Sequence, residues 1–241
     1  MTAPILVADC VTKSYGERRV LSAGTLRAVP GTVRVIFGRN GVGKSTLMKI
    51  ASGWMQADSG MVHLLGEPVL RPSLAYLASK GVFYLPDHDL LSSSFTVRRQ
   101  LNFFHDVYRR RGVDEAAKLA DVRECLDRRV HSLSGGEGRR AELAAVLVRQ
   151  PLCLLADEPY RGIAPVDHEQ VTRLLRLVAS EGCAVVVTGH DVPSLLAAAD
   201  HVTWCTAGTT YELGAPSAAR AHERFVQEYL GPREHVPQKR D

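Results

Sequence analysis

Short runs of mainly apolar residues recur along the chain, and each ends at a glycine, a proline or a charged residue. They lie at 33–37, 81–85, 152–156 and 184–188. Because a strand that is covered on both faces needs no polar alternation, such runs are typical of central strands in a parallel sheet. The pattern therefore predicts a mainly parallel core sheet that is buried between two layers.

A different pattern occupies the first thirty residues, where short apolar segments alternate with polar ones. Turn-forming residues at 15–17 and 30–31 divide these segments, and turns of this kind join antiparallel strands. The segment 61–65, and later the segments 202–205 and 210–213, are predicted as further strands beside turns. We therefore expect an N-terminal antiparallel β-subdomain and a closing hairpin.

Helical periodicity fills most of the remaining chain. Segments with helical spacing and no internal proline are predicted as helices: 44–50, 73–80, after Gly135-Gly136 to about Arg149, and 167–181. Between residues 96 and 130, apolar residues recur at this spacing on both sides of Gly112, which indicates a helical subdomain inserted at about 88–150. Strands that alternate with helices define an α/β fold. We expect one domain over 1–231 and a frayed tail at 232–241.

The composition is that of an ordinary globular protein, with 241 residues, 45% of them hydrophobic, and a net charge of +4. Such a charge is too small by itself to indicate nucleic-acid binding. Arginine pairs and a triplet cluster in the middle third of the chain. They fit solvated helix faces, which we favour, or a surface for an anionic partner.

The cysteines and the apolar runs indicate in which cellular compartment the chain is expected. Five cysteines stand far apart and match no metal-binding spacing, so we expect free thiols in a reducing cytosol. No N-terminal signal peptide is recognisable. Because no apolar run reaches about 18 residues, we expect no membrane-spanning helix.

The first candidate chemistry is a complete phosphate-binding loop. Its residues are Gly38, Arg39, Asn40, Gly41, Val42, Gly43, Lys44, Ser45 and Thr46. The loop lies between a predicted strand and a predicted helix, where backbone N–H groups and the helix dipole attract phosphate. Lysine at this position reaches the β- and γ-phosphates, and the Ser45 hydroxyl suits Mg²⁺. A chance match is the alternative, and the flanking strand and helix disfavour it.

Other polar residues follow the predicted strands. Asp157 and Glu158 come directly after an apolar strand, where one carboxylate can hold Mg²⁺ and the other can polarise a water. His190 also follows a strand and is either incidental or a phosphate contact. Tyr15 lies in a turn, where its ring could stack on a purine. Ser134 and Glu137 fit a helix capping box, which leaves the glycines between them unexplained.

In this order the segments make the chain similar to the nucleotide-binding subunits of ATP-binding-cassette (ABC) transporters over nearly its whole length. Residues 38–46 match the Walker A loop, 133–137 resemble the LSGGQ signature, and 152–158 match the Walker B strand. Tyr15 resembles the aromatic residue that stacks on adenine, and His190 resembles the switch histidine.

The resemblance implies an ABC-type P-loop NTPase that hydrolyses ATP to ADP and phosphate. Two copies would pair head to tail around two ATP molecules, each held by residues 38–46 of one copy and by Ser134, Gly135 and Gly136 of the other. The implied roles are catalytic for Glu158, His190 and Lys44, and Mg²⁺-binding for Ser45 and Asp157.

Two positions depart from the family pattern. Asp87 stands where the family usually has glutamine; it can still approach Mg²⁺, but it is shorter and charged. Ala164 stands where the family usually has aspartate. The sequence Gly162-Ile163-Ala164-Pro165 resembles branched-chain amino-acid importer cassettes, and Leu-Ser-Gly-Gly-Glu resembles lipopolysaccharide-transport cassettes.

We therefore expect a transporter ATPase subunit that works with a second cassette, as a homodimer, and with separate transmembrane permease subunits. The resemblance places it in the cytoplasm, on the inner face of the cell membrane, with no direct nucleic-acid partner. One alternative is a non-transport ABC ATPase that acts on DNA or ribosomes. Another is a regulatory cassette with reduced turnover, suggested by Asp87 and Ala164.

Overall fold

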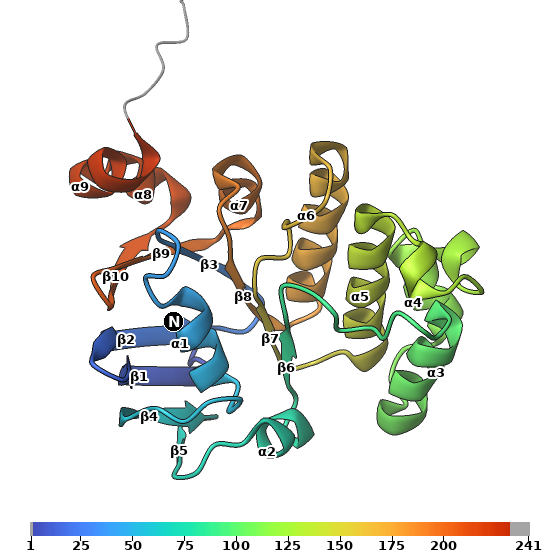
Figure 1. Ribbon diagram of the computed structural model, residues 1–241, viewed down its shortest axis with the longest axis horizontal. Coiled ribbons are helices and arrows are strands. Elements are labelled where there is room, and N and C mark those ends of the chain that lie inside the picture. The colour runs from blue at the N-terminus through green and yellow to red at the C-terminus, as the bar shows by residue number, and fades with distance from the viewer. Residues whose placement is uncertain (1, 232–241) are drawn as a thin grey trace, which may run out of the picture.

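The computed structural model describes residues 2–231 (Figure 1). Within this range ten strands form one sheet in the order β5-β4-β1-β2-β10-β9-β3-β8-β7-β6. The antiparallel strands lie at one end of the molecule and the helices α3 and α4 at the other. The expected α/β fold with an antiparallel β-subdomain and a helical subdomain is confirmed.

The parallel strands β3 (Val33–Phe37), β8 (Ala184–Thr188), β7 (Cys153–Ala156) and β6 (Val82–Leu85) form the core of the sheet. All residues of these strands are buried. The apolar runs are thus confirmed as buried parallel strands, although β6 is the last strand of the sheet rather than a central one. The C-terminal ends of the four strands lie along the same side of the sheet, which is where ligands bind in open α/β sheets.

The antiparallel part contains β1 (Leu6–Tyr15), β2 (Arg18–Ala28), β4 (Ser59–Leu64) and β5 (Glu67–Val69). The hairpin of β9 (His201–Thr206) and β10 (Thr209–Gly214) links it to the core, since β9 pairs with β3 and β10 touches β2. The closing hairpin is therefore confirmed, and it joins the two parts of the sheet.

Helices cover both faces of the sheet. They are α1 (Lys44–Ala51), α2 (Leu74–Ser79), α3 (Val97–Tyr108), α4 (Val113–Leu119), α5 (Gly135–Arg149), α6 (Pro165–Ser180), α7 (Val192–Ala198), α8 (Pro216–Ala221) and α9 (Glu223–Phe225). Of these, α1 and α2 pack on one face and α5, α6 and α7 on the other, while α3 and α4 pack against α5. Single turns of 3₁₀-helix lie at Arg123–Cys125 and Val130–Ser132, and a π-helical turn covers Val226–Leu230.

The sequence pattern missed α7, β5 and the helical segment after β10. It also placed the start of α5 two residues late, because the helix includes both residues of the pair Gly135-Gly136. The extent of the single domain and of the helical subdomain stays a prediction, and the expected frayed tail lies outside the described residues. Every helix within residues 2–231 is too short or too polar to cross a membrane.

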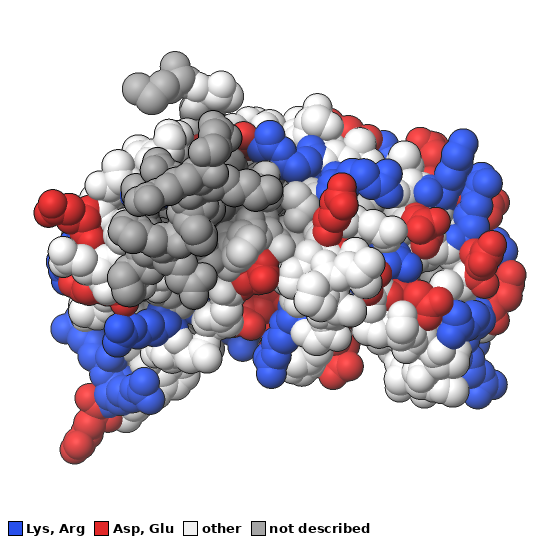
Figure 2. Space-filling model, turned by 90° about the horizontal axis from the view of Figure 1, so that it is seen from above, with Lys and Arg blue, Asp and Glu red and all other residues white. Residues whose placement is uncertain are grey.

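Charged residues of both signs are mixed on the face shown in Figure 2, and this holds over the helical subdomain at its right. Arg98 binds Asp127 at 2.7 Å, and Arg128 binds Glu137 at 2.9 Å. These ion pairs favour solvated helix faces as the explanation of the arginine cluster. All five cysteines are free thiols, as expected.

Candidate nucleotide-binding site

The phosphate-binding loop joins β3 to α1, and its glycines are required by the packing around it. Gly41 and Gly43 have φ of 73° and 112°, a region that residues with a side chain rarely adopt. A Cβ atom at Gly43 would lie 2.6 Å from Cδ2 of Leu21, and one at Gly38 would lie 2.4 Å from the carbonyl oxygen of Cys205. The loop is therefore pressed between β2 and β9.

Lys44 folds back over this loop. Its Nζ donates to the carbonyl oxygens of Gly38 at 2.7 Å and Arg39 at 3.2 Å. Burial lowers the pKa of Lys44, while the nearby carboxylates of Glu158 and Asp157 oppose that shift. A buried ammonium group is thus held where phosphate oxygens could replace the loop carbonyls as acceptors.

Asp157 lies at the end of β7 and is almost fully buried, with 2% of its surface exposed. It accepts hydrogen bonds from the hydroxyls of Ser45 at 3.1 Å, Tyr84 at 3.0 Å and Thr188 at 2.5 Å. Burial, followed by the charge of Asp157, raises the pKa of Tyr84. These partners come from α1, β6 and β8, so the carboxylate is fixed by the neighbours on every side.

Glu158 begins the turn after β7 and has a left-handed backbone, with φ of 48°. Its N–H donates to Oγ1 of Thr188 at 3.0 Å, and its Oε1 lies 2.9 Å from Nε2 of His190. Thr188 therefore forms hydrogen bonds with both Asp157 and Glu158. The structure brings Glu158 and His190 together from the ends of two adjacent strands.

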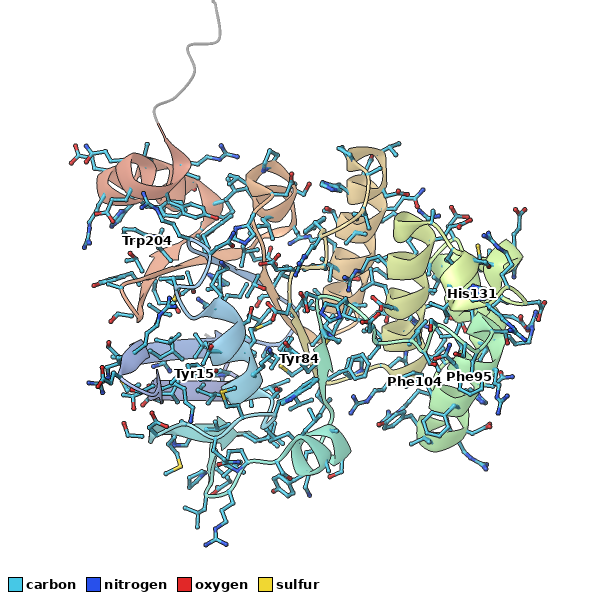
Figure 3. All side chains as sticks on the ribbon, viewed as in Figure 1. Tyr15, Tyr84, Phe95, Phe104, His131 and Trp204 are labelled. Atoms are coloured by element: carbon cyan, nitrogen blue, oxygen red, sulfur yellow. The ribbon has the colours of Figure 1, made fainter. Side chains whose placement is uncertain are left out.

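A cavity of about 380 Å³ lies in front of these groups. The residues that line it come from the β-subdomain, from the phosphate-binding loop with the start of α1, and from the turn after β7. They are Tyr15, Arg18, Val20, Asn40, Gly41, Gly43, Lys44, Ser45, Thr46 and Glu158. Tyr15 is 48% exposed, and its hydroxyl lies 3.1 Å from Sδ of Met55. Figure 3 places Tyr15 at the strands β1 and β2, away from Tyr84 in the core.

The signature residues lie elsewhere, at the start of α5, and line no part of that cavity. Ser134 and Glu137 form the predicted capping box, with hydrogen bonds of 3.2 and 2.8 Å. The hydrogen bond from the Ser134 N–H, with Arg128 and Cys125 adding to it, lowers the pKa of Glu137 to about 2.

The two glycines of the signature pack against the turn that follows β7 and against the first turn of α6. A Cβ atom at Gly135 would lie 2.4 Å from the carbonyl oxygen of Gly162, and one at Gly136 would lie 2.2 Å from Oδ2 of Asp167. Both glycines are therefore needed for contacts within the chain, whatever they bind.

Asp87 does not line the cavity either. Its carboxylate forms an ion pair with Arg161, and its carbonyl oxygen accepts from Nη2 of Arg139 at 2.5 Å. Ala164 is the N-cap of α6 and offers no side-chain hydrogen bond there.

The sequence pattern missed four residues of this region: Arg18, Tyr84, Thr188 and Arg161. Thr188 and Tyr84 belong to strands that the pattern did predict. Their position near the ends of strands beside β7 was the available signal, since neighbouring parallel strands end together.

Oxygen donors suited to Mg²⁺ are present, because Ser45 and Asp157 lie within hydrogen-bonding distance of each other. No cluster of three or more His, Cys, Asp or Glu side chains that could hold a metal occurs among residues 2–231. This donor set fits Mg²⁺, which takes one or two protein ligands together with phosphate oxygens and water.

A phosphate-binding loop beside carboxylates at the end of the neighbouring strands defines the class of P-loop nucleotide-binding proteins. The family model described as ABC transporter matches residues 21–161. The chain therefore belongs to the ABC transporter family. It is an ATP-binding, ATP-hydrolysing subunit of the kind that works with transmembrane subunits and a second cassette.

Named relatives cover most of the chain. It is 28% identical to the lipopolysaccharide export system ATP-binding protein LptB of Haemophilus influenzae, over 94% of this chain and 97% of that protein. It is 33% identical to the Nod factor export ATP-binding protein I of Paraburkholderia xenovorans, over 89% and 72%. The corresponding protein of Rhizobium etli is longer still, since the chain spans 66% of it.

Solved structures share the fold. An ATP-binding cassette of an ABC transporter in its ADP conformation has a TM-score of 0.84 and 21% identity, and the match covers 96% of this chain and all of that one. The protein cbiO1 of Clostridium perfringens, part of an ABC transporter complex, has a TM-score of 0.78 and 25% identity, over 93% and 94%.

Proposed function

We propose that two copies of this chain bind two ATP molecules with Mg²⁺ between them, and that Glu158 is the base that activates the attacking water. The contact of Glu158 with His190, beside the loop that carries Lys44, is the observation that carries this proposal. The N–H of Glu158 fixes its backbone to Thr188, and its carboxylate contacts His190 beside the cavity that the residue lines.

Each residue of the site has a role in this proposal. Tyr15 stacks on the adenine, residues 38–46 bind the phosphates, and Lys44 neutralises charge on the β- and γ-phosphates. His190 holds the γ-phosphate and the water beside Glu158. Asp157 and Ser45 hold Mg²⁺, and Asp87 is a further candidate ligand. Mg²⁺, when bound, offsets the negative charge that develops on the phosphates.

The need for a second copy follows from the position of the signature. Ser134, Gly135 and Gly136 begin a helix of 15 residues but line no part of the cavity. The N-terminus of a helix attracts phosphate, and this one is free to do so only for a nucleotide held by another chain. We therefore propose a head-to-tail homodimer.

The membrane subunit has a candidate docking surface beside Asp87 and the helical subdomain. Phe103 of α3 is 67% exposed, and Trp54, which packs edge-on against Tyr84, is 54% exposed. Aromatic side chains are enriched at protein–protein interfaces relative to the rest of the surface. Docking there would hold the chain at the cytoplasmic face of the membrane. The named relatives export different cargoes, so we assign the choice of cargo to the membrane subunits.

The substitution Glu158→Gln tests the base and the dimer together. It keeps the size of the side chain but removes the proton acceptor, so ATP hydrolysis should fall by a factor of about 10²–10⁴. With ATP and Mg²⁺ the variant should form a dimer in size-exclusion chromatography with light scattering. The control is Glu67→Gln, in the exposed strand β5. A monomeric variant that hydrolyses ATP at the parent rate would show that the assignment of Glu158 is wrong.

A further inference from the structure

Arg18 lines the nucleotide cavity but has no role in the proposed mechanism. In the hairpin of β1 and β2 it pairs with Tyr15, and the next residue, Arg19, pairs with Ser14. Residues that pair directly across two strands point to the same face, whereas neighbours in one strand point to opposite faces. Tyr15 and Arg18 therefore share the face of the hairpin that borders the cavity, which Val20 also lines. Arg19 belongs to the other face.

The guanidinium group of Arg18 reaches from this hairpin to the phosphate-binding loop. Its Nη2 donates to the carbonyl oxygen of Gly41 at 3.5 Å, which is a long and therefore weak hydrogen bond. A Cβ atom at Gly41 would also lie 3.5 Å from this nitrogen. A phosphate oxygen in the cavity would be a better acceptor than the carbonyl, because a hydrogen bond between two charged groups is shorter and stronger.

The charges around the cavity leave Arg18 available to an anion. Its side chain is exposed, and within residues 2–231 it forms no ion pair with a carboxylate. Lys44 contributes a second cation to the same cavity, and Glu158 is the one acidic residue among the described residues that line it. Two cations and one carboxylate favour a ligand with several negative charges.

We propose that Arg18 is a further nucleotide-binding residue, whose guanidinium group exchanges the carbonyl oxygen of Gly41 for the α- and β-phosphates of the nucleotide. This inference rests on the proposed function, which places the adenine on Tyr15 and the terminal phosphates at Lys44. Because Arg18 pairs with Tyr15 and contacts the loop at Gly41, it spans the interval between the base and the terminal phosphates. ADP carries both the α- and the β-phosphate, so ADP and ATP should gain equally from this contact.

The experiment is isothermal titration calorimetry of the full chain with ADP and with a non-hydrolysable ATP analogue, both with Mg²⁺. Arg18→Gln removes the charge and keeps part of the stem. It should weaken the binding of both nucleotides by the same factor, about three- to tenfold, which lies between the effect of a surface ion pair and that of a buried hydrogen bond to a charge. Arg18→Lys should recover part of the loss. Arg19→Gln, the matched control on the other face of the hairpin, should leave both affinities unchanged.

Salt separates a charge contact from a packing effect. The difference in affinity between the unsubstituted chain and Arg18→Gln should shrink at high salt, because exposed charges are screened. The inference is overturned if Arg18→Gln leaves both affinities unchanged, if Arg19→Gln weakens binding as much, or if the difference is as large at high salt. A loss for the ATP analogue alone also overturns it, because the contact would then lie on the γ-phosphate.

The proposed nucleotide site has its own outcome in the same experiment. Lys44→Ala should weaken the binding of both nucleotides, since its ammonium group is assigned to their phosphates. If the unsubstituted chain binds neither nucleotide, or if Lys44→Ala binds both as tightly as the unsubstituted chain, the proposed site is overturned and the inference with it. If Lys44→Ala weakens binding and Arg18→Gln does not, the inference alone is overturned. Thermal melting of each variant checks that the fold is kept.

Discussion

Thr188 bonds to both acidic residues of the site, to the carboxylate of Asp157 and to the backbone N–H of Glu158, and its substitution tests the geometry described above. The hydroxyl of Thr188 donates to Asp157 at 2.5 Å and accepts from the N–H of Glu158 at 3.0 Å. The residue is fully buried at the end of β8. Thr188→Val replaces the hydroxyl with a methyl group of similar size, so the packing stays while both hydrogen bonds are lost.

The expected loss of stability follows from these two bonds. A hydrogen bond to a charged group contributes about 1.5–3 kcal/mol, and a buried N–H left without a partner costs about 1–3 kcal/mol. Ser45 and Tyr84 still bind the Asp157 carboxylate, so the lower half of the combined range applies. We expect Thr188→Val to lower the free energy of unfolding by about 2.5–4 kcal/mol.

Thr188→Ser is the matched control, because it keeps the hydroxyl and removes one methyl group. It should cost about 0.5–1.5 kcal/mol, as for other deletions of one buried methyl. Urea unfolding followed by circular dichroism measures both variants, and ATP turnover should fall further in Thr188→Val because the Glu158 backbone is released. Equal destabilisation by the two substitutions would refute the argument, since the hydroxyl would then contribute nothing.

Two further predictions concern the start of α5. Gly136→Ala places a Cβ atom 2.2 Å from Oδ2 of Asp167. Thermal melting should therefore show that the variant is destabilised by about 1–3 kcal/mol, as for other overpacked sites. The control is Gly138→Ala, which should not destabilise the fold because its Cβ atom would meet nothing within 4 Å. Because the pKa of Glu137 is lowered to about 2, the carboxylate stabilises the fold above its unfolded pKa, and this contribution is lost as the pH falls from about 4.5 to 2. Glu137→Gln should therefore reduce the stability lost over this interval, and an unchanged acid limb of the unfolding curve would contradict the assignment.

The core of the site could be predicted because its residues follow from local sequence. A phosphate-binding loop needs a strand before it and a helix after it, and both are visible in the pattern at 33–37 and 44–50. Asp157 and Glu158 follow an apolar run and therefore had to lie at a strand end. The same reasoning brings His190 beside them, because β7 and β8 turned out to be neighbours.

Other features could not be predicted because they depend on contacts between distant segments. The pair of Arg161 with Asp87 joins loops that are far apart in sequence, and only the order of β6 and β7 brings them together. The helix α7 begins two residues after His190 and has a proline near its start. Its apolar pattern is short, so the sequence did not distinguish it from the loop before it. The resemblance explained Gly135 and Gly136 by phosphate binding. Their close contacts with Gly162 and Asp167 could not be read from the sequence, because they depend on how α5 packs against the segment after β7.

These contacts show how the two halves of the proposed dimer could respond to one nucleotide. Arg139 of α5 holds the loop after β6 through the carbonyl oxygens of Pro86 and Asp87. Gly135, at the start of the same helix, lies against Gly162 in the turn after β7. Because α5 is in contact with both loops, we expect a displacement of either loop to be passed to the signature end of the helix. A change at the nucleotide of one copy would thus reach the residues that we propose to bind the nucleotide of the other.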